Sequence, residues 1–339
     1  MSTQRYNWFE QTTPIRPGEP NPGWSAIKWI PELQIFVCVG ENTNQVMISP
    51  DGYNWSLQNS PLGKWVKIAW SPSLLLIVAI ARLTTGNAVM TSPNGINWTI
   101  RSTPADITSL GAIDWSPGLG IFVALTTGDD RGMYSVDGIN WVSFPLPAAS
   151  GVRDVVWSPE LNIFVAICGG AAFPLLSSDG INWTKYPVVN PDIFYKIIWA
   201  KELGLFVAGS HTSPINHSII TSVDGINWIQ ETTPSYVTGL TWSAEARSIA
   251  TIGIDSGIHD VTLSPDGINY LPQNNSIHNN WIDITYSPLK GIFVGIASSL
   301  PYADINKLAI VGAVGSANEN KNYISNVWGL IPEIGKFLN

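Results

Sequence analysis

The residues best suited to chemistry lie in a short segment that recurs six times along the chain. Its copies read SPDGYNWS, SPNGINWT, SVDGINWV, SSDGINWT, SVDGINWI and SPDGINYL, spaced 42 to 45 residues apart. A carboxylate at a fixed place in such a motif could transfer protons, hold a metal ion or fix a turn. The residues at that place are Asp51, Asn94, Asp137, Asp179, Asp224 and Asp266.

The motif itself favours the turn. An Asp or Asn side chain accepts hydrogen bonds from nearby backbone N–H groups, and the following Gly adopts positive φ without steric cost. Asn94 stands in for Asp while the rest of its copy is kept, so hydrogen bonding matters more than charge. Calcium would need several oxygen ligands close together in sequence, and each copy offers one. We therefore interpret these six residues as structural.

A second set of reactive side chains lies outside the repeats, in segments that differ from one repeat to the next. Zinc would require three or four of the histidines and carboxylates to converge. The simpler interpretation is that these side chains are solvated on the surface of the loops. Contact with a ligand is the alternative, and we expect no metal and no cofactor. The candidate ligand-binding residues are Arg82, Asp129, Asp130, Arg131, His211, His217, Asp255, His259, Tyr302 and Asp304.

The element that must carry these residues is itself a repeat. A second motif, typified by WSPELNIFVAI, occurs seven times, at residues 29–39, 70–80, 115–125, 157–167, 199–209, 242–252 and 286–296. Each unit reads as four short strands separated by Gly, Pro, Asn and Asp, without helical periodicity. Seven such units predict an all-β, seven-bladed β-propeller of four-stranded antiparallel blades. The blades should begin near residues 24, 65, 110, 152, 194, 237 and 281.

The two ends of the sequence predict how the ring closes. Residues 6–8 (YNW), followed by FEQTTP, match residues 226–228 (INW), followed by IQETTP. The chain therefore begins with the last strand of a repeat, and residues 5–10 should complete blade seven beside a third strand at 307–314. We expect one propeller domain over residues 1–314 and a C-terminal tail over 315–339. The tail is apolar enough to pack on its own domain or to dock a partner.

Four strands per blade give the propeller two unlike faces. The turns near WSPxL and near SxDG are nearly identical in all blades and should share one face, whereas the variable loops should share the other. Loops on a rigid scaffold are where binding residues concentrate. Three residues before the aromatic residue that opens each WSPEL-type motif, charges should gather at the axial channel towards the variable face. Ion pairing within the channel is the simpler role, and ligand binding the alternative, for Lys67, Asp154, Lys196 and Asp283.

The S-x-D-G-x-x-W motif resembles a shortened Asp-box, the turn signature of sialidase-type (BNR-like) propellers. The combined WSPELxxFVA and SPDGINWT repeat also resembles propellers encoded by bacteriophages and large viruses. The resemblance implies the fold over about residues 5–314, and by analogy a virion or tail component or a receptor- or glycan-recognising module. A sialidase-like glycoside hydrolase would need an arginine cluster or two opposed carboxylates. No local group of three arginines stands out among the seven, so we expect no enzyme.

Composition limits the partners. The net charge is −8, only 12% of residues are charged, and no basic run occurs, which argues against nucleic acid. No apolar run is long enough for a membrane span, and no signal-peptide pattern begins the sequence. Cys38 and Cys168 are expected to be buried thiols. We expect a protein partner or a cell-surface glycan, with a virion-associated or extracellular location favoured; an intracellular assembly platform is the alternative.

Overall fold

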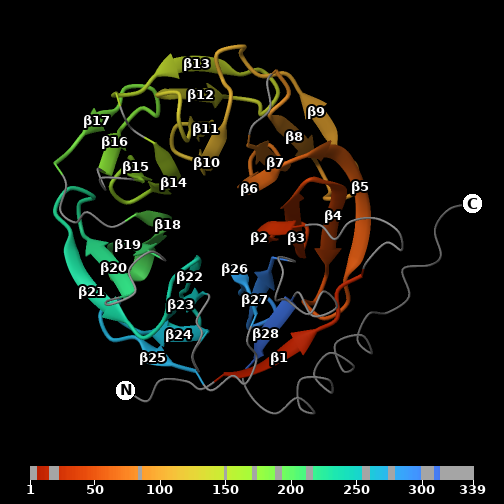
Figure 1. Cartoon of the computed structure of the whole chain (residues 1–339), viewed down its shortest axis with the longest axis vertical. Helices are drawn as coiled ribbons and strands as arrows, with labels where there is room; N and C mark the ends of the chain where they lie inside the picture. The colour runs from red at the N-terminus through yellow and green to blue at the C-terminus, as the bar shows by residue number, and fades with distance from the viewer. Residues whose placement is uncertain are drawn as a thin grey trace, which may run out of the picture.

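The protein is a seven-bladed β-propeller closed around a central axis (Figure 1). The computed structural model describes residues 6–14, 23–82, 86–148, 151–169, 174–187, 193–210, 217–253, 260–273, 279–298 and 309–313. Within them lie seven four-stranded antiparallel sheets and a single 3-10 turn, Lys201–Leu203. The predicted fold class is confirmed.

The first four blades run from the axis outwards in chain order. Their strands are β2 (Gly23–Ile30), β3 (Ile35–Glu41), β4 (Thr43–Ser49) and β5 (Ser56–Gly63); β6 (Trp65–Ser71), β7 (Leu76–Ala81), β8 (Val89–Ser92) and β9 (Thr99–Arg101); β10 (Leu110–Ser116), β11 (Ile121–Thr126), β12 (Arg131–Ser135) and β13 (Val142–Pro145); β14 (Val152–Ser158), β15 (Ile163–Cys168), β16 (Pro174–Ser177) and β17 (Thr184–Lys185).

Blades five to seven repeat this order, except that the last blade takes its outer strand from the start of the chain. Their strands are β18 (Phe194–Ala200), β19 (Leu205–Ser210), β20 (His217–Ser222) and β21 (Ile229–Thr233); β22 (Gly239–Ser243), β23 (Ser248–Ile252), β24 (Val261–Ser264) and β25 (Leu271–Pro272); β26 (Trp281–Ser287), β27 (Ile292–Ala297), β28 (Ala309–Ala313) and β1 (Asn7–Gln11).

The ring closes where the sequence predicts. Strand β1 pairs antiparallel with β28, in a register that places Asn7 opposite Ala313 and Gln11 opposite Ala309. Trp8 lies 6.2 Å from Phe293 of the same blade, ring centre to ring centre. The first strand thus joins the last blade by backbone hydrogen bonds and by aromatic packing, so that one blade unites the two ends of the repeat region.

In five of the seven blades the core is built on an aromatic residue of the first strand against a Phe of the second, whereas Ile77 and Ile249 take the place of Phe in blades two and six. Trp115 and Phe122 lie 4.6 Å apart, Trp199 and Phe206 4.5 Å apart. In the blades with Phe, the Trp of the outermost strand region adds a third ring, as Trp141 does at 6.4 Å from Phe122. Such tilted pairs add to the free energy of burial, so the high Trp content serves the fold.

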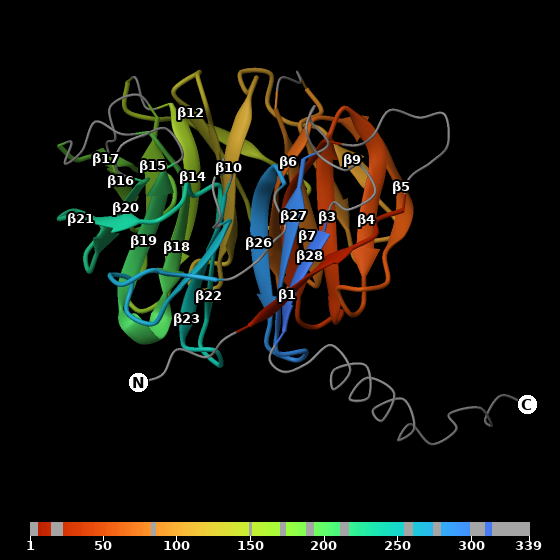
Figure 2. The ribbon, with the colours of Figure 1, turned by 60° about the horizontal axis from the view of Figure 1, so that its bottom comes forward.

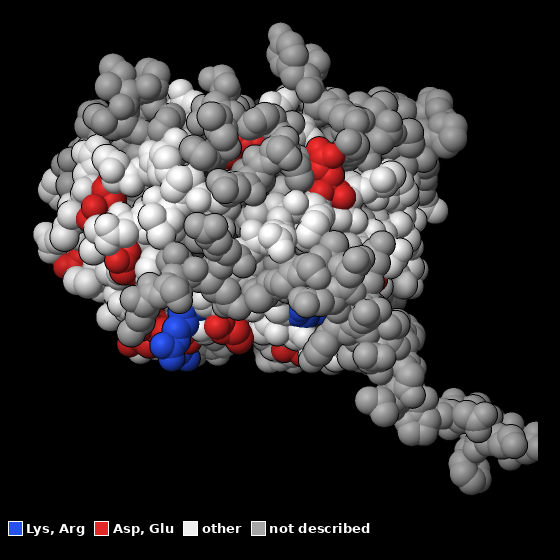
Figure 3. Space-filling view, turned by 90° about the horizontal axis from the view of Figure 1, so that it is seen from below, with Lys and Arg blue, Asp and Glu red and all other residues white. Residues whose placement is uncertain are grey.

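The turns between first and second strands and those between third and fourth strands lie on one face of the propeller. In Figure 2 the hairpin from β26 to β27 lies at the lower rim, and the described loop from β11 to β12 lies at the upper rim. Figure 3, a side view, shows few charged atoms scattered over a mostly neutral described surface. The side chains that concentrate charge lie instead along the axis.

A β-bulge interrupts the innermost strand near the upper face. The register between first and second strands shifts in six blades, for example between Trp65 and Lys67 and between Val152 and Asp154. A bulge inserts one extra residue and re-aims its side chain. The residue at this place is Ser25, Val66, Gly111, Arg153, Tyr195 or Ile282 in the six bulged blades, and Thr238 holds the same repeat position in the sixth blade.

Candidate binding site at the axial channel

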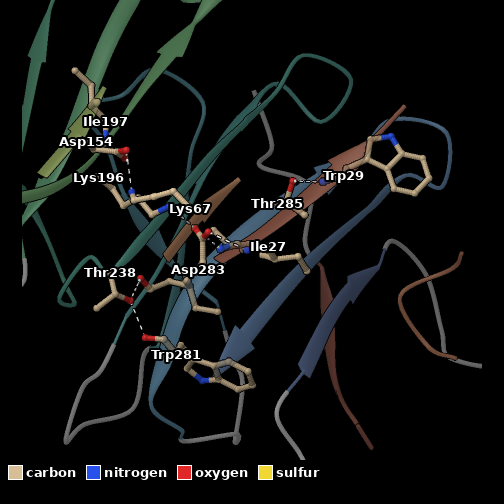
Figure 4. A network of polar contacts seen from close by, with 12 residues as sticks. Ile27, Trp29, Lys67, Asp154, Lys196, Ile197, Thr238, Trp281, Asp283 and Thr285 are labelled. Carbon is tan, nitrogen blue, oxygen red and sulfur yellow. Dashed lines mark hydrogen bonds and ion pairs between the residues drawn. The ribbon is translucent and has the colours of Figure 1, made fainter. Parts of the chain in front are cut away.

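Two ion pairs cross the axial channel at the level of the predicted charged ring. Lys67 Nζ lies 2.8 Å from Asp154 Oδ1, and Lys196 Nζ lies 2.9 Å from Asp283 Oδ1 (Figure 4). All four side chains are nearly buried, with between 5% and 15% of their surface exposed. The sequence predicts that these four residues gather at the axis, and the structure shows how they pair.

Each pair skips one blade. Lys67 of blade two reaches Asp154 of blade four, and Lys196 of blade five reaches Asp283 of blade seven. The blade passed over carries a small residue at the same position, Ala112 in one case and Gly239 in the other. A Cβ on Gly239 would meet Asp283 Cα at 2.7 Å, so only Gly fits there. The repeating order lysine, small residue, aspartate builds a polar layer across the channel.

Each aspartate also binds the backbone of the next blade. Asp154 Oδ2 accepts the N–H of Ile197 at 3.2 Å, and Asp283 Oδ2 accepts that of Ile27 at 3.2 Å (Figure 4). In blade three the corresponding position is Ala112, but two residues further along the same strand Asp114 Oδ2 accepts the N–H of Trp157 at 2.8 Å. Through Oδ2 these carboxylates tie neighbouring blades together, and Asp154 and Asp283 use Oδ1 for the lysine across the skipped blade.

The two lysines titrate differently. Burial lowers the pKa of Lys67 to about 8; the nearby Lys196 charge acts in the same direction, and the Asp154 and Asp283 carboxylates offset part of the effect. Burial also acts against the charge of Lys196, but Asp283 and Asp154 outweigh it and raise its pKa. Lys67 is therefore the cation of this layer that loses its proton near neutral pH.

The ion-pair layer separates two compartments, because Lys67 and Lys196 line both. The lower one, towards the repeated turns, has a volume of about 300 Å³ and is walled by the aliphatic residues of the inner strands, such as Ile68 and Leu240. The upper one, which we call the mouth, has a volume of about 250 Å³. The mouth opens on the face of the variable loops.

The mouth is lined largely by the residues of the bulge position. It is formed by Ser25, Glu41, Val66, Lys67, Arg82, Thr127, Arg153, Tyr195, Lys196, Thr238 and Ile282. Every blade contributes at least one of them. Sequence reasoning missed Arg153 and Tyr195, because strict strand alternation does not reveal a bulge. The available signal was that the residue four places before the aromatic that opens the WSPEL-type motif differs in every blade.

Cations dominate the mouth. Arg153 stacks over the Tyr195 ring at 5.4 Å, and Arg82 Nη1 lies 3.9 Å from Glu41 Oε1, a long contact. The Nε atoms of Arg82 and Arg153 are buried, and neither has a hydrogen-bond partner among the described residues. A buried donor without a partner costs free energy, and an anion in the mouth would relieve that cost.

The hydroxyl groups of the mouth are already used. Ser25 Oγ donates to Trp65 O, and Thr238 Oγ1 donates to Trp281 O at 2.8 Å (Figure 4). Thr127 Oγ1 lies 3.0 Å from Ser109 Oγ. Apart from Glu41 and Tyr195, the remaining lining is apolar or cationic, from Val66 and Ile282 to the lysines and arginines. The site is chemically suited to an anionic group with an apolar neighbour.

Of the predicted loop residues, Arg82 lines the mouth and three others bond within their own region. Asp129 Oδ2 accepts hydrogen bonds from the N–H and the hydroxyl of Thr108, and Arg131 Nε lies 3.6 Å from Asp106 Oδ2. Asp130 adopts a positive φ of 48°. These residues connect the loop to the segment that enters blade three, and they do not line the mouth.

The side chains of the other predicted loop residues lie outside the part of the chain that the structure describes. His217 begins β20, and only its backbone is described. His211, Asp255, His259, Tyr302 and Asp304 lie outside the described residues, as does the predicted tail at 315–339. Within the described ranges, no three His, Cys, Asp or Glu side chains are grouped so as to hold a metal ion. No helix in that part of the chain is long and apolar enough to cross a membrane.

The six motif residues Asp51, Asn94, Asp137, Asp179, Asp224 and Asp266 hold turns on the opposite face. Asp179 Oδ1 accepts the backbone N–H groups of Ile181 and Asn182 at 2.9 and 2.7 Å, and Oδ2 accepts the Asn182 side-chain amide at 2.7 Å. Asn94 keeps the two backbone bonds, at 3.0 and 2.9 Å. Slight desolvation opposes these bonds, but they lower the pKa of Asp179 to about 2.

Comparison with known proteins supports the fold alone. No family model matches the sequence, and no curated protein matches it. Among solved structures, a streptogramin B lyase is 12% identical with a TM-score of 0.74, over 92% of this chain and 99% of that one. YCF48 bound to D1 peptide is 13% identical (TM-score 0.65, 93% and 97%), and the WD40 propeller domain of Doa1 12% (0.65, 93% and 98%). The chain is therefore similar in fold to propellers of unlike function.

Proposed function

We propose that this protein is a non-enzymatic binding protein that recognises a polypeptide partner through its variable face, with the mouth of the axial channel as the anchor. The observation that carries this proposal is the mouth itself. Seven blades converge on one pocket that is lined by two arginines, and the Nε atoms of both are buried without a hydrogen-bond partner among the described residues. Pockets with a few converging polar groups are the usual binding sites of rigid scaffolds.

The contrast between the two faces supports the proposal. On the repeated-turn face, the motif aspartates already bind their own backbone, and each turn Trp donates to the Gly carbonyl, as Trp183 does to Gly180 O at 3.2 Å. Those groups are thus already engaged in holding their own turns. At the mouth the residue type changes with every blade, so the sequence is free to specify a ligand there.

The inner carboxylates favour binding over catalysis. Asp154 and Asp283 each pair with a lysine and accept a backbone N–H. A general acid or base must be able to exchange its proton with a substrate, and groups held in this way serve the scaffold. The similarity to streptogramin B lyase rests on 12% identity and carries no catalytic residue to this chain. We therefore keep the non-enzymatic interpretation as part of the proposal.

A polypeptide suits the mouth better than a sugar. Glycan recognition relies on hydrogen bonds to many hydroxyls, and the hydroxyls of Ser25, Thr127 and Thr238 are already bonded within the protein. Among the structural neighbours, YCF48 was solved with a bound peptide. The glycan-recognising virion component expected from the repeat resemblance stays a prediction, as does the assembly platform.

The test is a pair of arrays probed with the labelled protein, one of peptides and one of glycans. The proposal expects peptide binding that weakens at least tenfold in Arg153→Gln and persists in Arg131→Gln, whose side chain lies outside the mouth. Binding to glycans alone would replace the polypeptide partner by a sugar. Peptide binding that survives substitution of both Arg153 and Arg82 would move the site away from the mouth.

A further inference from the structure

We infer that the mouth is a receptor for a free carboxylate, namely the C-terminal carboxylate of a polypeptide chain that ends in an apolar residue. This inference rests on the proposed function and specifies its ligand. It depends on three features of the mouth: the balance of charge, the geometry of the two guanidinium groups, and the apolar wall beside them.

The charge balance leaves room for one negative charge. The cations Lys67, Lys196, Arg82 and Arg153 face three carboxylates, those of Asp154, Asp283 and Glu41. One positive charge is unmatched among the described residues when Lys67 is protonated. A singly charged carboxylate restores neutrality, whereas a phosphate dianion would leave an excess negative charge in a partly buried site.

The arginines supply the matching hydrogen bonds. A guanidinium group presents a planar fork of donors that fits the two oxygens of a carboxylate. Arg153 is held in place by the Tyr195 ring at 5.4 Å and by close packing on Gly169, where a Cβ would come within 2.6 Å of Arg153 Nε. An arginine fixed in this way loses little conformational entropy when it binds an anion.

The shape of the mouth selects a chain end. Lys67 and Lys196 of the ion-pair layer line the inner end of the mouth, so a ligand that enters from the variable face meets this layer with its leading end. A volume of about 250 Å³ accommodates the last one or two residues of a chain. Val66 and Ile282 offer an apolar wall to the terminal side chain, and the preceding residues would lie over the loops.

The experiment compares a peptide acid with its amide. The tripeptide N-acetyl-Ala-Ala-Leu, with a free C-terminus, is titrated into the ¹⁵N-labelled protein, and the Nε–Hε signals of Arg82 and Arg153 are followed by NMR. The same tripeptide as its C-terminal amide is the matched control. We expect a saturable shift of both signals with the acid and at least tenfold weaker binding of the amide. Acetate should displace the acid more effectively than phosphate at equal ionic strength.

Variants locate the contact. Arg153→Gln should abolish the shift at Arg82 and weaken the binding of the acid at least tenfold. Arg153→Lys should fall between, because it keeps the charge and loses the fork. Arg131→Gln is the control on the same face. Equal binding of acid and amide would overturn the carboxylate receptor while leaving the proposed polypeptide partner intact. Absence of any saturable shift with the acid, in wild-type protein that needs no substitution, would also overturn it.

Discussion

Lys67 of the second blade forms its ion pair with Asp154 of the fourth blade, at 2.8 Å across the axial channel, and passes over Ala112 of the blade between. Lys196 and Asp283 repeat the arrangement over Gly239. Each of these two ion pairs links two blades that are separated by a third blade. The ion pairs in the central channel thus help to hold the blades together. They also form the floor of the mouth.

The free energies of unfolding lost by removing Lys67 and by removing Asp154 should not be additive. Asp154→Ala leaves the Lys67 ammonium and the Ile197 N–H without an acceptor, and loss of one partner from a buried ion pair costs about 3–5 kcal/mol. The double variant Lys67→Met, Asp154→Ala should be less destabilised than the sum of the two single variants. Urea unfolding of the four proteins measures the coupling. Additive effects would show that the pair contributes no coupling.

The binding of a carboxylate at the mouth should weaken as the pH rises. The pKa of Lys67 is lowered to about 8, chiefly by burial, and the groups facing it are Asp154, Lys196 and Asp283. Loss of the Lys67 proton removes the unmatched positive charge, so affinity for the tripeptide acid should fall about threefold to tenfold between pH 7 and pH 9. Lys67→Met should bind weakly and without this pH dependence. Affinity that is flat with pH in the wild type would contradict the role given to Lys67.

The WSPEL glutamates should each stabilise the following blade. Glu160 Oε2 accepts the indole N–H of Trp199 at 2.6 Å, whereas Trp115 Nε1 is buried without a partner because Ser73 occupies the glutamate position of its neighbour. Ser73→Glu should supply that acceptor and raise the free energy of unfolding by about 1 kcal/mol.

Removal of a glutamate tests the equivalent contact, between Glu160 and Trp199. Glu160→Ala should lower the free energy of unfolding by about 1 kcal/mol, and for a chain of this size each change should move Tm by about 2 °C in its own direction. Differential scanning calorimetry measures both. A Ser73→Glu protein no more stable than wild type would contradict the proposed acceptor.

The motif aspartates should make stability depend on acid. Their folded-state pKa values of about 2, for Asp137, Asp179, Asp224 and Asp266, lie below the usual value near 4. A depressed pKa contributes stability that is present above pH 4 and is lost as the pH falls to about 2. Because these groups are largely solvent-screened, each contributes at most about 1 kcal/mol.

A single substitution isolates one of these turns. Asp179→Asn copies Asn94, which keeps both backbone bonds through Oδ1, and loses the acceptor that Asp179 Oδ2 offers to Asn182. The variant should be about 1 kcal/mol less stable than wild type at pH 7 and equally stable near pH 2. Equal destabilisation at both values would mean that ionisation of Asp179 has no part in the turn.

The sequence predicts the ring because its information is periodic. The recurrence of Trp and Asp-Gly specifies seven blades, and the Asn-Trp at residues 7–8 specifies closure with β28. It also places Lys67, Asp154, Lys196 and Asp283 at the axis. The pairing across a skipped blade was beyond it, because that depends on where the long lysine side chains point. Arg153 escaped prediction because a bulge changes the phase of side-chain alternation, and strict alternation along the strand does not place this residue in the channel.

The central claim, that the variable face binds the partner, can be tested by blocking each face in turn. Cys38 and Cys168 are buried, and burial raises the pKa of both thiols, so an introduced cysteine is labelled selectively. Gly128→Cys lies in the loop between β11 and β12, where a Cβ meets no atom within 4 Å. Leu289→Cys lies between β26 and β27, on the repeated-turn face, at a side chain that is 57% exposed.

The measurement is peptide binding after each variant is coupled to a maleimide carrying a bulky polyethylene glycol chain. The account predicts that the polymer at position 128 abolishes binding of the peptides selected on the array and that the polymer at position 289 leaves it unchanged. Binding that is lost only with the polymer at position 289 would place the partner on the repeated-turn face and contradict the account.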